Sequence, residues 1–316
     1  MAIDISERAG GEPPLESRQL FDIAADGMIA HPVSFEGLAG IFHPARKDVQ
    51  RDHAVLFVSP WGMEELCSRK FQRVLAEQLA ASGVASLRFD YLGSGDALDP
   101  DDVGRVADWL SDTRAAFEYL KRLSGCSGVV VVAQGLGCAI AAQALAGTAP
   151  AGSMALLAPV VSGRAYLREL AMWSSMIDDG LGLLPAQRSV QPGAIAGMTM
   201  PVGVADTLKR INLSGLETVP ALNILVLARA GRVTDSDLAR HLAALGGEVK
   251  EAAFSGYDDL VSSPTLSKIS GDVVNRLVDW VLSQTLAGNP ATPPSDFTIN
   301  APQRGYGFLE KPVLSG

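Results

Sequence analysis

Residues 129–138 of the chain read Val129-Val-Val-Val-Ala-Gln-Gly-Leu-Gly-Cys138. The first five residues are continuously apolar, which is typical of a strand buried on both faces of a parallel sheet. A glycine-containing turn then leads into residues 136–146, which are mostly small and apolar and predict a helix. This strand, turn and helix indicate an α/β protein with a parallel sheet.

The same alternation of apolar strands and amphipathic helices extends along the chain in both directions. Strands are expected at 28–35, 37–43, 54–58, 84–89, 154–158, 222–228 and 248–254, and helices at 68–82, 105–123, 234–245 and 272–286. The first two strands form a predicted hairpin around Glu36-Gly37. Thr234 and Asp237 have the spacing of a capping box. We therefore expect a mostly parallel, twisted sheet flanked by helices.

The chain divides into one domain with an insertion and two irregular ends. Residues 1–16 are polar and predict a flexible N-terminal arm, and 17–287 form the α/β domain. More than sixty residues separate the strands expected at 154–158 and 222–228, which is too long for an ordinary crossover. We interpret about 163–218 as a lid insertion. Residues 288–316 are a Pro/Gly-rich tail that wraps the domain or reaches a partner.

Composition excludes several classes of protein. The 316 residues carry a net charge of −9, with 47% hydrophobic and 19% charged residues, which is typical of a globular protein and not of a disordered one. The acidic balance argues against nucleic-acid binding. Three cysteines fit a reducing compartment, and no apolar run is long enough to cross a bilayer. Without a secretory signal, the expected location is the cytoplasm.

The turn after residue 133 has the layout of a nucleophile elbow. In the motif G-x-S-x-G, a sharp turn between strand and helix presents the serine at its centre. Here the stretch is Ala133-Gln-Gly-Leu-Gly137, so Gly135 stands at the nucleophile position. The glycines of the turn are present and the serine is not.

Three further stretches carry a resemblance to a known family. They are Val58-Ser-Pro-Trp-Gly-Met-Glu64, Leu87-Arg-Phe-Asp-Tyr-Leu-Gly-Ser-Gly-Asp96 and Leu157-Ala-Pro-Val-Val-Ser-Gly-Arg-Ala-Tyr-Leu-Arg-Glu-Leu170. With the elbow, they are similar to the α/β-hydrolase superfamily, especially its serine-aminopeptidase-like and exosortase-associated hydrolases, over about residues 28–287. The first stretch resembles the loop that supplies an oxyanion-hole amide, and the last resembles the entry to the lid. In the second, Asp96 replaces the family's final serine.

The resemblance implies a triad of Ser, Asp or Glu, and His, in that order along the chain. Gly135 occupies the serine position. The loop expected to hold the acid, 228–234, contains no carboxylate. Asp235 and Asp237 follow it, and we interpret them as first-turn residues of the next helix, stabilised by its dipole.

The histidine is expected after the strand at 248–254, where residues 255–265 contain none. We assign surface or packing roles to the histidines that the chain does have, His31, His43, His53 and His241. All three triad positions are therefore predicted to be vacant.

Cys138 is a candidate for a substitute nucleophile, because it lies in the first helical turn after Gly135, where a helix dipole lowers a thiol's pKa. No base is near it in the sequence, and the alternative is a buried packing role. Ser59 and Cys67 flank the oxyanion loop, also without an activating group. No catalytic residue is intact, and no metal or cofactor is expected.

The binding half of the site does not depend on the missing side chains. The family's oxyanion hole uses main-chain amides, which correspond here to Leu136 and to Trp61 or Gly62. A carbonyl or anion could dock there; alternatively, the glycines only satisfy the turn. The candidate ligand-binding residues are Trp61, Gly62, Met63, Gln134, Gly135, Leu136 and Tyr257.

A dinucleotide fingerprint is the rival interpretation of Gly135-Leu-Gly-Cys-Ala-Ile140. Its third position requires Gly or Ala and holds Ile140, and the acidic residue expected after the next strand is replaced by Ala158-Pro159. The sequence thus gives little support to a nucleotide site.

Three hypotheses for function follow. The first is a catalytically inactive homologue that binds a small acyl or carbonyl ligand, or a protein partner, in the former active-site pocket. The second is an active acyl hydrolase or a lyase with displaced residues drawn from Cys138, Asp90, Asp96 and Tyr257. Against it, Asp90 with Arg88 is expected to tie strand to loop, and Asp96 to cap the following turn.

The third hypothesis is a scaffold or assembly subunit. The tail carries the aromatic residues Phe297, Tyr306 and Phe308, a residue type favoured at interfaces. A tail packed on its own domain is the alternative. The sequence is also compatible with a homo-oligomer.

Overall fold

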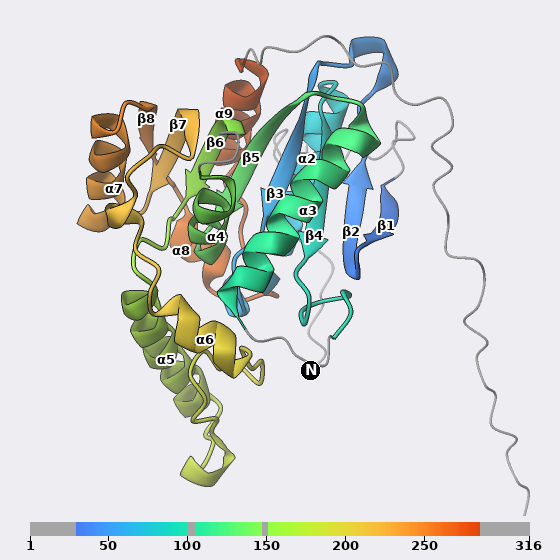
Figure 1. Ribbon diagram of the computed structural model, residues 1–316. Helices are drawn as coiled ribbons and strands as arrows, with labels where there is room; N and C mark the ends of the chain where they lie inside the picture. Colours follow the sequence, from blue (N-terminus) through green and yellow to red (C-terminus); the bar gives the residue numbers. More distant parts are fainter. Residues whose placement is uncertain (1–29, 100–104, 147–150, 285–316) are drawn as a thin grey trace, which may run out of the picture.

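A single eight-stranded sheet forms the centre of the computed structural model, which describes residues 30–99, 105–146 and 151–284 (Figure 1). The strand order is β1-β2-β4-β3-β5-β6-β7-β8. β2 runs antiparallel to its neighbours β1 and β4, and every other adjacent pair is parallel. The strands are β1 (His31–Phe35), β2 (Leu38–His43), β3 (His53–Val58), β4 (Ala85–Asp90), β5 (Gly128–Gln134), β6 (Ala151–Leu157), β7 (Ala221–Ala228) and β8 (Glu248–Ala253).

Helices cover both faces of this sheet. They are α2 (Met63–Ala81), α3 (Val106–Ser124), α4 (Leu136–Leu145), α5 (Gly163–Gly180), α6 (Val202–Leu208), α7 (Val233–Ala244), α8 (Tyr257–Val261) and α9 (Gly271–Leu282), with short 3-10 turns at Lys47–Val49, Pro185–Gln187 and Leu213–Gly215. Figure 1 shows α3 and α4 on one face, and α2 and α9 on the other. The predicted α/β architecture is confirmed.

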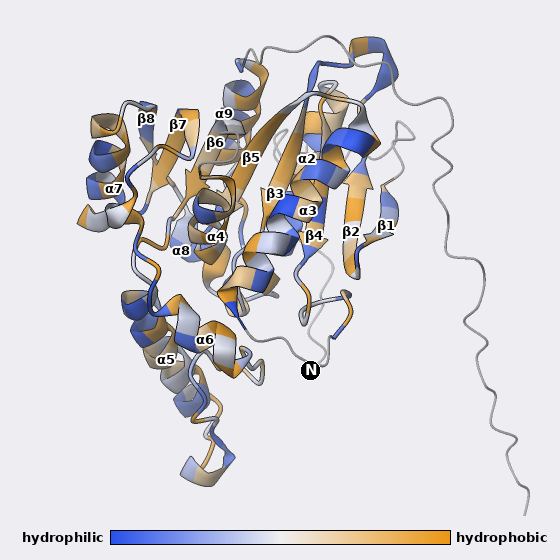
Figure 2. Cartoon of the chain, viewed as in Figure 1, coloured by the Kyte–Doolittle hydropathy of each residue, from blue (hydrophilic) through white to orange (hydrophobic). Residues whose placement is uncertain are grey.

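The apolar strands bury side chains on both faces. In β5, Val131 belongs to the core under α3 and α4, whereas Val130 and Val132 belong to the core under α2 and α9. Figure 2 shows the hydrophobic strands between helices whose outer faces are more hydrophilic. Because side chains on both faces of β5 are buried, its sequence is continuously apolar and does not alternate between apolar and polar residues.

The turn between β5 and α4 combines a positive φ at one glycine with a close main-chain approach at the other. Gly135 has φ +54°, a left-handed conformation that is costly for residues with a Cβ. A Cβ on Gly137 would overlap the main-chain carbonyl of Val58 at the end of β3. The elbow geometry predicted from residues 133–137 is therefore present, and it brings the start of α4 against the loop after β3.

Several element boundaries differ from the prediction. α2 begins at Met63 and not at residue 68, so part of the quoted oxyanion loop is helical. α8 was not predicted at all. The expected capping box of Thr234 and Asp237 is wrong, because α7 begins at Val233 with no side-chain cap, and the side chain of Asp235 bonds elsewhere. Residues 28 and 29 of the first expected strand, the arm 1–16 and the tail 288–316 lie outside the described residues.

The long connection between β6 and β7 contains α5 and α6. Figure 1 shows both helices beyond the carboxyl ends of the parallel strands. Leu170 of α5 and Val204 of α6 are buried in the core shared with α3 and α4, so the base of this insertion packs on the domain. Among the described helices, none has the length and apolar character needed to span a bilayer.

Two substitutions in α7 test this packing. Leu238 is fully buried, whereas Val233 in the first turn is 68% exposed. We expect Leu238→Ala to lower the free energy of unfolding by about 2–5 kcal/mol, through lost burial and a cavity. Val233→Ala should change it by less than about 0.5 kcal/mol. Denaturant unfolding of both variants measures the difference, and equal losses would contradict the assigned burial.

Candidate active site

The space in front of Gly135 is occupied by the carboxylate of Glu64. A Cβ built on Gly135 would overlap all three terminal atoms of that side chain. The Gly135 main chain is fixed by β6 and the loop that follows it, because its N–H donates to the carbonyl of Leu157 (2.9 Å) and its carbonyl accepts from the N–H of Val160 (3.1 Å). The position where the elbow would present a serine hydroxyl is therefore filled by a carboxylate from the first turn of α2.

Glu64 is buried and bound by two neutral donors. Its Oε1 accepts hydrogen bonds from Nε2 of Gln134 and from the hydroxyl of Tyr257, both at 3.2 Å. The Gln134 amide also donates to Oγ of Ser68 (2.7 Å). Burial raises the pKa of Glu64 to about 6, against the opposing effects of these hydrogen bonds and of the nearby Arg229 charge. Burial thus makes ionisation of the Glu64 carboxyl group costly, and the hydrogen bonds from Gln134 and Tyr257 offset only part of that cost.

An ion pair follows β7 in the loop where the family places its acid. Asp235 is fully buried and accepts from the main-chain N–H of Arg229 (2.9 Å), from its Nε (3.0 Å) and from its Nη2 (2.8 Å). The same Nη2 donates to the carbonyl of Pro159 (2.9 Å). Burial acts to lower the pKa of Arg229, but the pairing with Asp235 outweighs it and keeps the pKa above its usual value.

This finding corrects the interpretation of Asp235. It does lie in the first turn of α7, as expected, but its partner is the Arg229 guanidinium and not the helix dipole alone. The Arg229 guanidinium carbon lies 5.8 Å from the centre of the Tyr257 ring. A continuous set of contacts therefore runs from Asp235 through Arg229 and Tyr257 to Glu64.

The insertion contacts the loop after β3, next to this network. Nε1 of Trp61 donates to the carbonyl of Gly193 (3.3 Å), and Ile195 lies against Gly62, which has φ +67°. The hydroxyl of Tyr166, on α5, is buried without a hydrogen-bond partner in the described part of the chain. Burial and then the charge of Glu64 raise the pKa of Tyr166 well above its usual value.

The predicted binding residues are brought together, but most are closed off from solvent. Trp61 is 9% exposed, Gln134 2% and Leu136 1%, whereas Met63 and Tyr257 are half-buried. Sequence reasoning missed Glu64, Arg229 and Tyr166 as members of the site. The one available signal was a carboxylate, Glu64, inside the otherwise uncharged stretch quoted for the oxyanion loop.

Cys138 has a packing role. It is fully buried, and its Sγ lies 3.2 Å from the carbonyl of Ala133 and 3.4 Å from that of Leu157. Burial raises its pKa well above the usual value, so the thiolate is disfavoured despite the helix N-terminus. Burial likewise raises the pKa of Cys67, to about 11, and Oγ of Ser59 donates to Oε1 of Gln72 (3.2 Å).

Asp90 and Asp96 hold a turn in a different arrangement from the expected one. Oδ2 of Asp90 accepts from the main-chain N–H of Asp96 (3.0 Å), so Asp90 is the capping side chain and Asp96 supplies the amide. The cation paired with Asp90 is Arg69 (3.4 Å), not Arg88. Within residues 30–99, 105–146 and 151–284, no three His, Cys, Asp or Glu side chains are grouped as metal ligands.

Comparisons with known proteins agree with this geometry. Residues 50–196 match the family model of serine aminopeptidases, S33. A search of curated protein sequences gives no significant match. Among solved structures, Est1E from Butyrivibrio proteoclasticus with bound ferulic acid is similar, with a TM-score of 0.56 and 16% identity, over 81% of this chain and 99% of that one.

Two further structures have the same fold. Proline iminopeptidase from Mycobacterium smegmatis has a TM-score of 0.52 and 14% identity, over 80% of this chain and 98% of that one. A protein from Pseudomonas aeruginosa described as hypothetical has a TM-score of 0.54 and 15% identity, over 80% and 93%. The chain therefore has the α/β-hydrolase fold, and over residues 50–196 it is similar to the serine aminopeptidases.

Proposed function

We propose that this protein is a catalytically inactive α/β-hydrolase homologue that acts by binding a small acyl- or carbonyl-bearing ligand. The observation that carries the proposal is the Glu64 carboxylate in front of Gly135, where the fold presents its nucleophile. A serine at 135 would overlap that carboxylate. The structure around the elbow is thus organised for glycine.

The surrounding groups support the absence of serine-hydrolase chemistry. Serine is a poor nucleophile unless a base accepts its proton, and the base must lie within hydrogen-bond reach. Tyr257 instead donates its hydroxyl to Glu64, and Arg229 is a permanent cation paired with Asp235. In the described part of the chain, no histidine side chain bonds to any of these groups.

The binding part of the proposal rests on the fold and its insertion. Similar structures include Est1E with bound ferulic acid and a proline iminopeptidase. We propose that the insertion, about 163–218, acts as a lid whose side chains select the ligand. Because Glu64 and the loop at Ile195 fill the former active site, the ligand needs a neighbouring cavity or a movement of that loop.

One observation favours a second candidate, an acyl hydrolase with displaced machinery. A carboxyl group whose pKa is about 6 is suited to general acid–base catalysis near neutral pH. Glu64 also lies beside the amides that correspond to the oxyanion hole. In this alternative, Glu64 activates a water molecule for direct attack on an ester or thioester.

Hydrolysis of p-nitrophenyl esters and acyl thioesters separates the two candidates. We expect the wild type to show no turnover above buffer, and no labelling by a fluorophosphonate serine-hydrolase probe, because no activated nucleophile is present. Glu64→Gln keeps the shape of the side chain and an acceptor for Gln134 and Tyr257. Cys138→Ala serves as a second control. Turnover that is lost in folded Glu64→Gln would establish the displaced-base alternative and refute the proposal.

The cost of burying Glu64 predicts how stability depends on pH. The folded-state pKa of about 6 lies above the ordinary value of 4.5, so ionisation is less favourable in the folded protein. The free energy of unfolding of the wild type should therefore fall, relative to Glu64→Gln, as pH rises through this interval. From about pH 5 to about pH 7.5 the relative loss is about 1 kcal/mol. Denaturant unfolding at both pH values measures it, and a constant difference would contradict the buried carboxylate.

A double-mutant cycle tests the packing of Glu64 on Gly135. Gly135→Ala should destabilise the protein by more than the ~1–2 kcal/mol that a left-handed conformation costs, because the methyl also overlaps Glu64. Glu64→Ala removes the overlap, so we expect a coupling energy of about 0.5–3 kcal/mol.

Gly137→Ala is the matched control for this cycle. Its methyl would overlap main-chain carbonyls after β3, which Glu64→Ala cannot relieve. We expect no coupling between Gly137 and Glu64. Coupling energies of equal size at both glycines would show that the carboxylate does not fill the elbow.

A further inference from the structure

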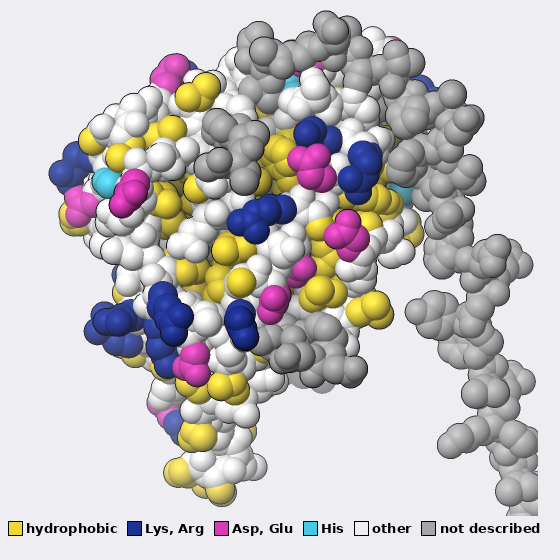
Figure 3. Space-filling view, in the orientation of Figure 1, with side chains coloured by type: hydrophobic (Ala, Val, Ile, Leu, Met, Phe, Trp, Pro, Cys, Tyr) yellow, Lys and Arg dark blue, Asp and Glu magenta, His cyan; other side chains and the backbone are white. Residues whose placement is uncertain are grey.

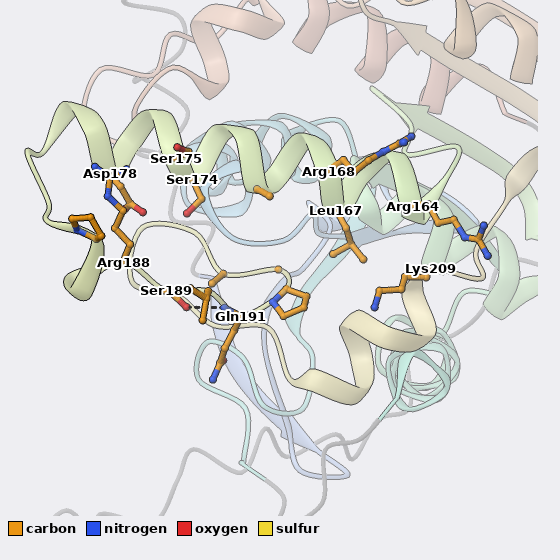
Figure 4. A pocket seen from close by; sticks show the side chains of 16 residues that line it. Arg164, Leu167, Arg168, Ser174, Ser175, Asp178, Arg188, Ser189, Gln191 and Lys209 are labelled. Atoms are coloured by element: carbon orange, nitrogen blue, oxygen red, sulfur yellow. Dashed lines mark hydrogen bonds between the residues drawn. The ribbon is translucent and has the colours of Figure 1, made fainter.

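A pocket of about 950 Å³ lies within the insertion, separate from the Glu64 network. One wall is a face of α5, and the other is the segment from residue 185 to 194 (Figure 4). This volume is at the upper end of the range for small-molecule sites. Every residue that lines it belongs to the stretch predicted as the insertion.

The loop that roofs the former active site is also a wall of this pocket. Gly193 and Ala194 line the pocket, whereas the carbonyl of Gly193 accepts from Trp61 and the next residue, Ile195, packs on Gly62. The insertion pocket and the loop next to the Glu64 network thus contact the same short segment, residues 193–195. A ligand in the insertion pocket would contact the roof of the Glu64 network without entering it.

The interior of the pocket is mainly apolar. Leu167 points from α5 into the space, as Figure 4 shows, and Ala171 follows it on the same face. Pro185, Val190 and Pro192 contribute from the opposite wall. Val190 is 94% exposed in this structure, so its side chain is available to contact a bound ligand.

Positive charge surrounds this apolar space. Arg164, Arg168, Arg188 and Lys209 line the pocket against one acidic residue, Asp178, although the whole chain has a net charge of −9. Figure 4 shows Arg164 and Lys209 at one end, and Figure 3 shows basic side chains gathered over this part of the surface. The lining is therefore opposite in sign to the protein as a whole.

The basic residues differ in what already engages them. Arg188 pairs with Asp179 (2.6 Å) and donates to the carbonyl of Leu183, so it fixes the segment. Lys209 pairs with exposed Asp206 (2.7 Å). Among the described residues, no ion pair or side-chain hydrogen bond engages Arg164. The end of the pocket at Arg164 and Lys209 thus keeps donors for an anion, namely the Arg164 guanidinium and the N–H groups of Lys209 that Asp206 does not engage.

We propose that this pocket binds a long-chain acyl anion, with its alkyl chain along Leu167 and Ala171 and its anionic head at Arg164 and Lys209. The head is a carboxylate or a phosphate, which present the same acceptor chemistry to a guanidinium and an ammonium group. This inference deepens the proposed binding function and rests on it, because it names the ligand class and moves its site out of the former catalytic pocket.

Isothermal titration calorimetry with dodecanoate and with dodecyl phosphate, each below its micelle concentration, tests the proposal. We expect saturable binding of at least one of the two, and the stronger one identifies the head group. Dodecanol and dodecyltrimethylammonium carry the same chain without an anion and should bind at least about tenfold more weakly, since a charge-assisted hydrogen bond is lost.

Variants assign the binding to this pocket. Arg164→Gln with Lys209→Gln should weaken binding about tenfold or more, and Ala171→Trp should abolish it by filling the apolar space. Arg210→Gln, an exposed neighbour outside the lining, is the matched control and should leave affinity unchanged. Circular dichroism confirms that each variant is folded.

Three results would overturn the inference: no binding of either anion by the wild type, equal binding of the neutral or cationic probe, or affinity that survives both Ala171→Trp and the paired charge removal. None of these involves turnover, because the probes contain no ester or thioester. Hydrolysis in the ester and thioester panel would instead overturn the proposed inactivity. The calorimetric titration would still decide whether the insertion pocket binds a long-chain acyl anion.

Discussion

A carboxylate buried against a left-handed glycine is the constraint on which the candidate site depends. Glu64 can lie where it does only because Gly135 has no side chain, and the turn tolerates φ +54° for the same reason. A buried carboxylate needs hydrogen-bond donors, which Gln134 and Tyr257 supply. Arg229 adds a positive charge nearby, and Asp235 compensates that charge in turn.

This chain of requirements explains why the site differs from a hydrolytic triad while keeping its scaffold. The main chain of the elbow, the strand ends and the loop after β3 keep the arrangement of the fold. The side chains on that scaffold satisfy one another. Glu64 accepts hydrogen bonds from Gln134 and Tyr257, and Arg229 is paired with Asp235. Two of the polar side-chain atoms that are buried without a partner in the described part of the chain lie in this region, the Tyr166 hydroxyl and Oε1 of Gln134.

Sequence reasoning recovered the architecture because the relevant signals are local. The apolar run of β5 and the glycines that follow it identify both a buried parallel strand and a sharp turn without any knowledge of distant residues. Glu64 could not be assigned in the same way, since its role depends on Gln134 and Tyr257, which are 70 and 193 residues away. Asp235 was misinterpreted for the opposite reason: a sufficient local role in the first turn concealed its pairing with Arg229. The basic pocket also escaped prediction, because one of its walls, residues 185–194, has little regular secondary structure, and its placement against α5 depends on contacts that no local pattern reveals.

The mutual fit of Glu64 and Gly135 also has an evolutionary consequence. A change from glycine to serine at position 135 is obstructed while Glu64 is present, and loss of Glu64 alone removes the acceptor that Gln134 and Tyr257 share. We expect each single step to lower stability, so the two positions constrain each other epistatically. A serine nucleophile at position 135 would therefore require at least two coordinated substitutions, one at each position, before selection for activity could begin to act.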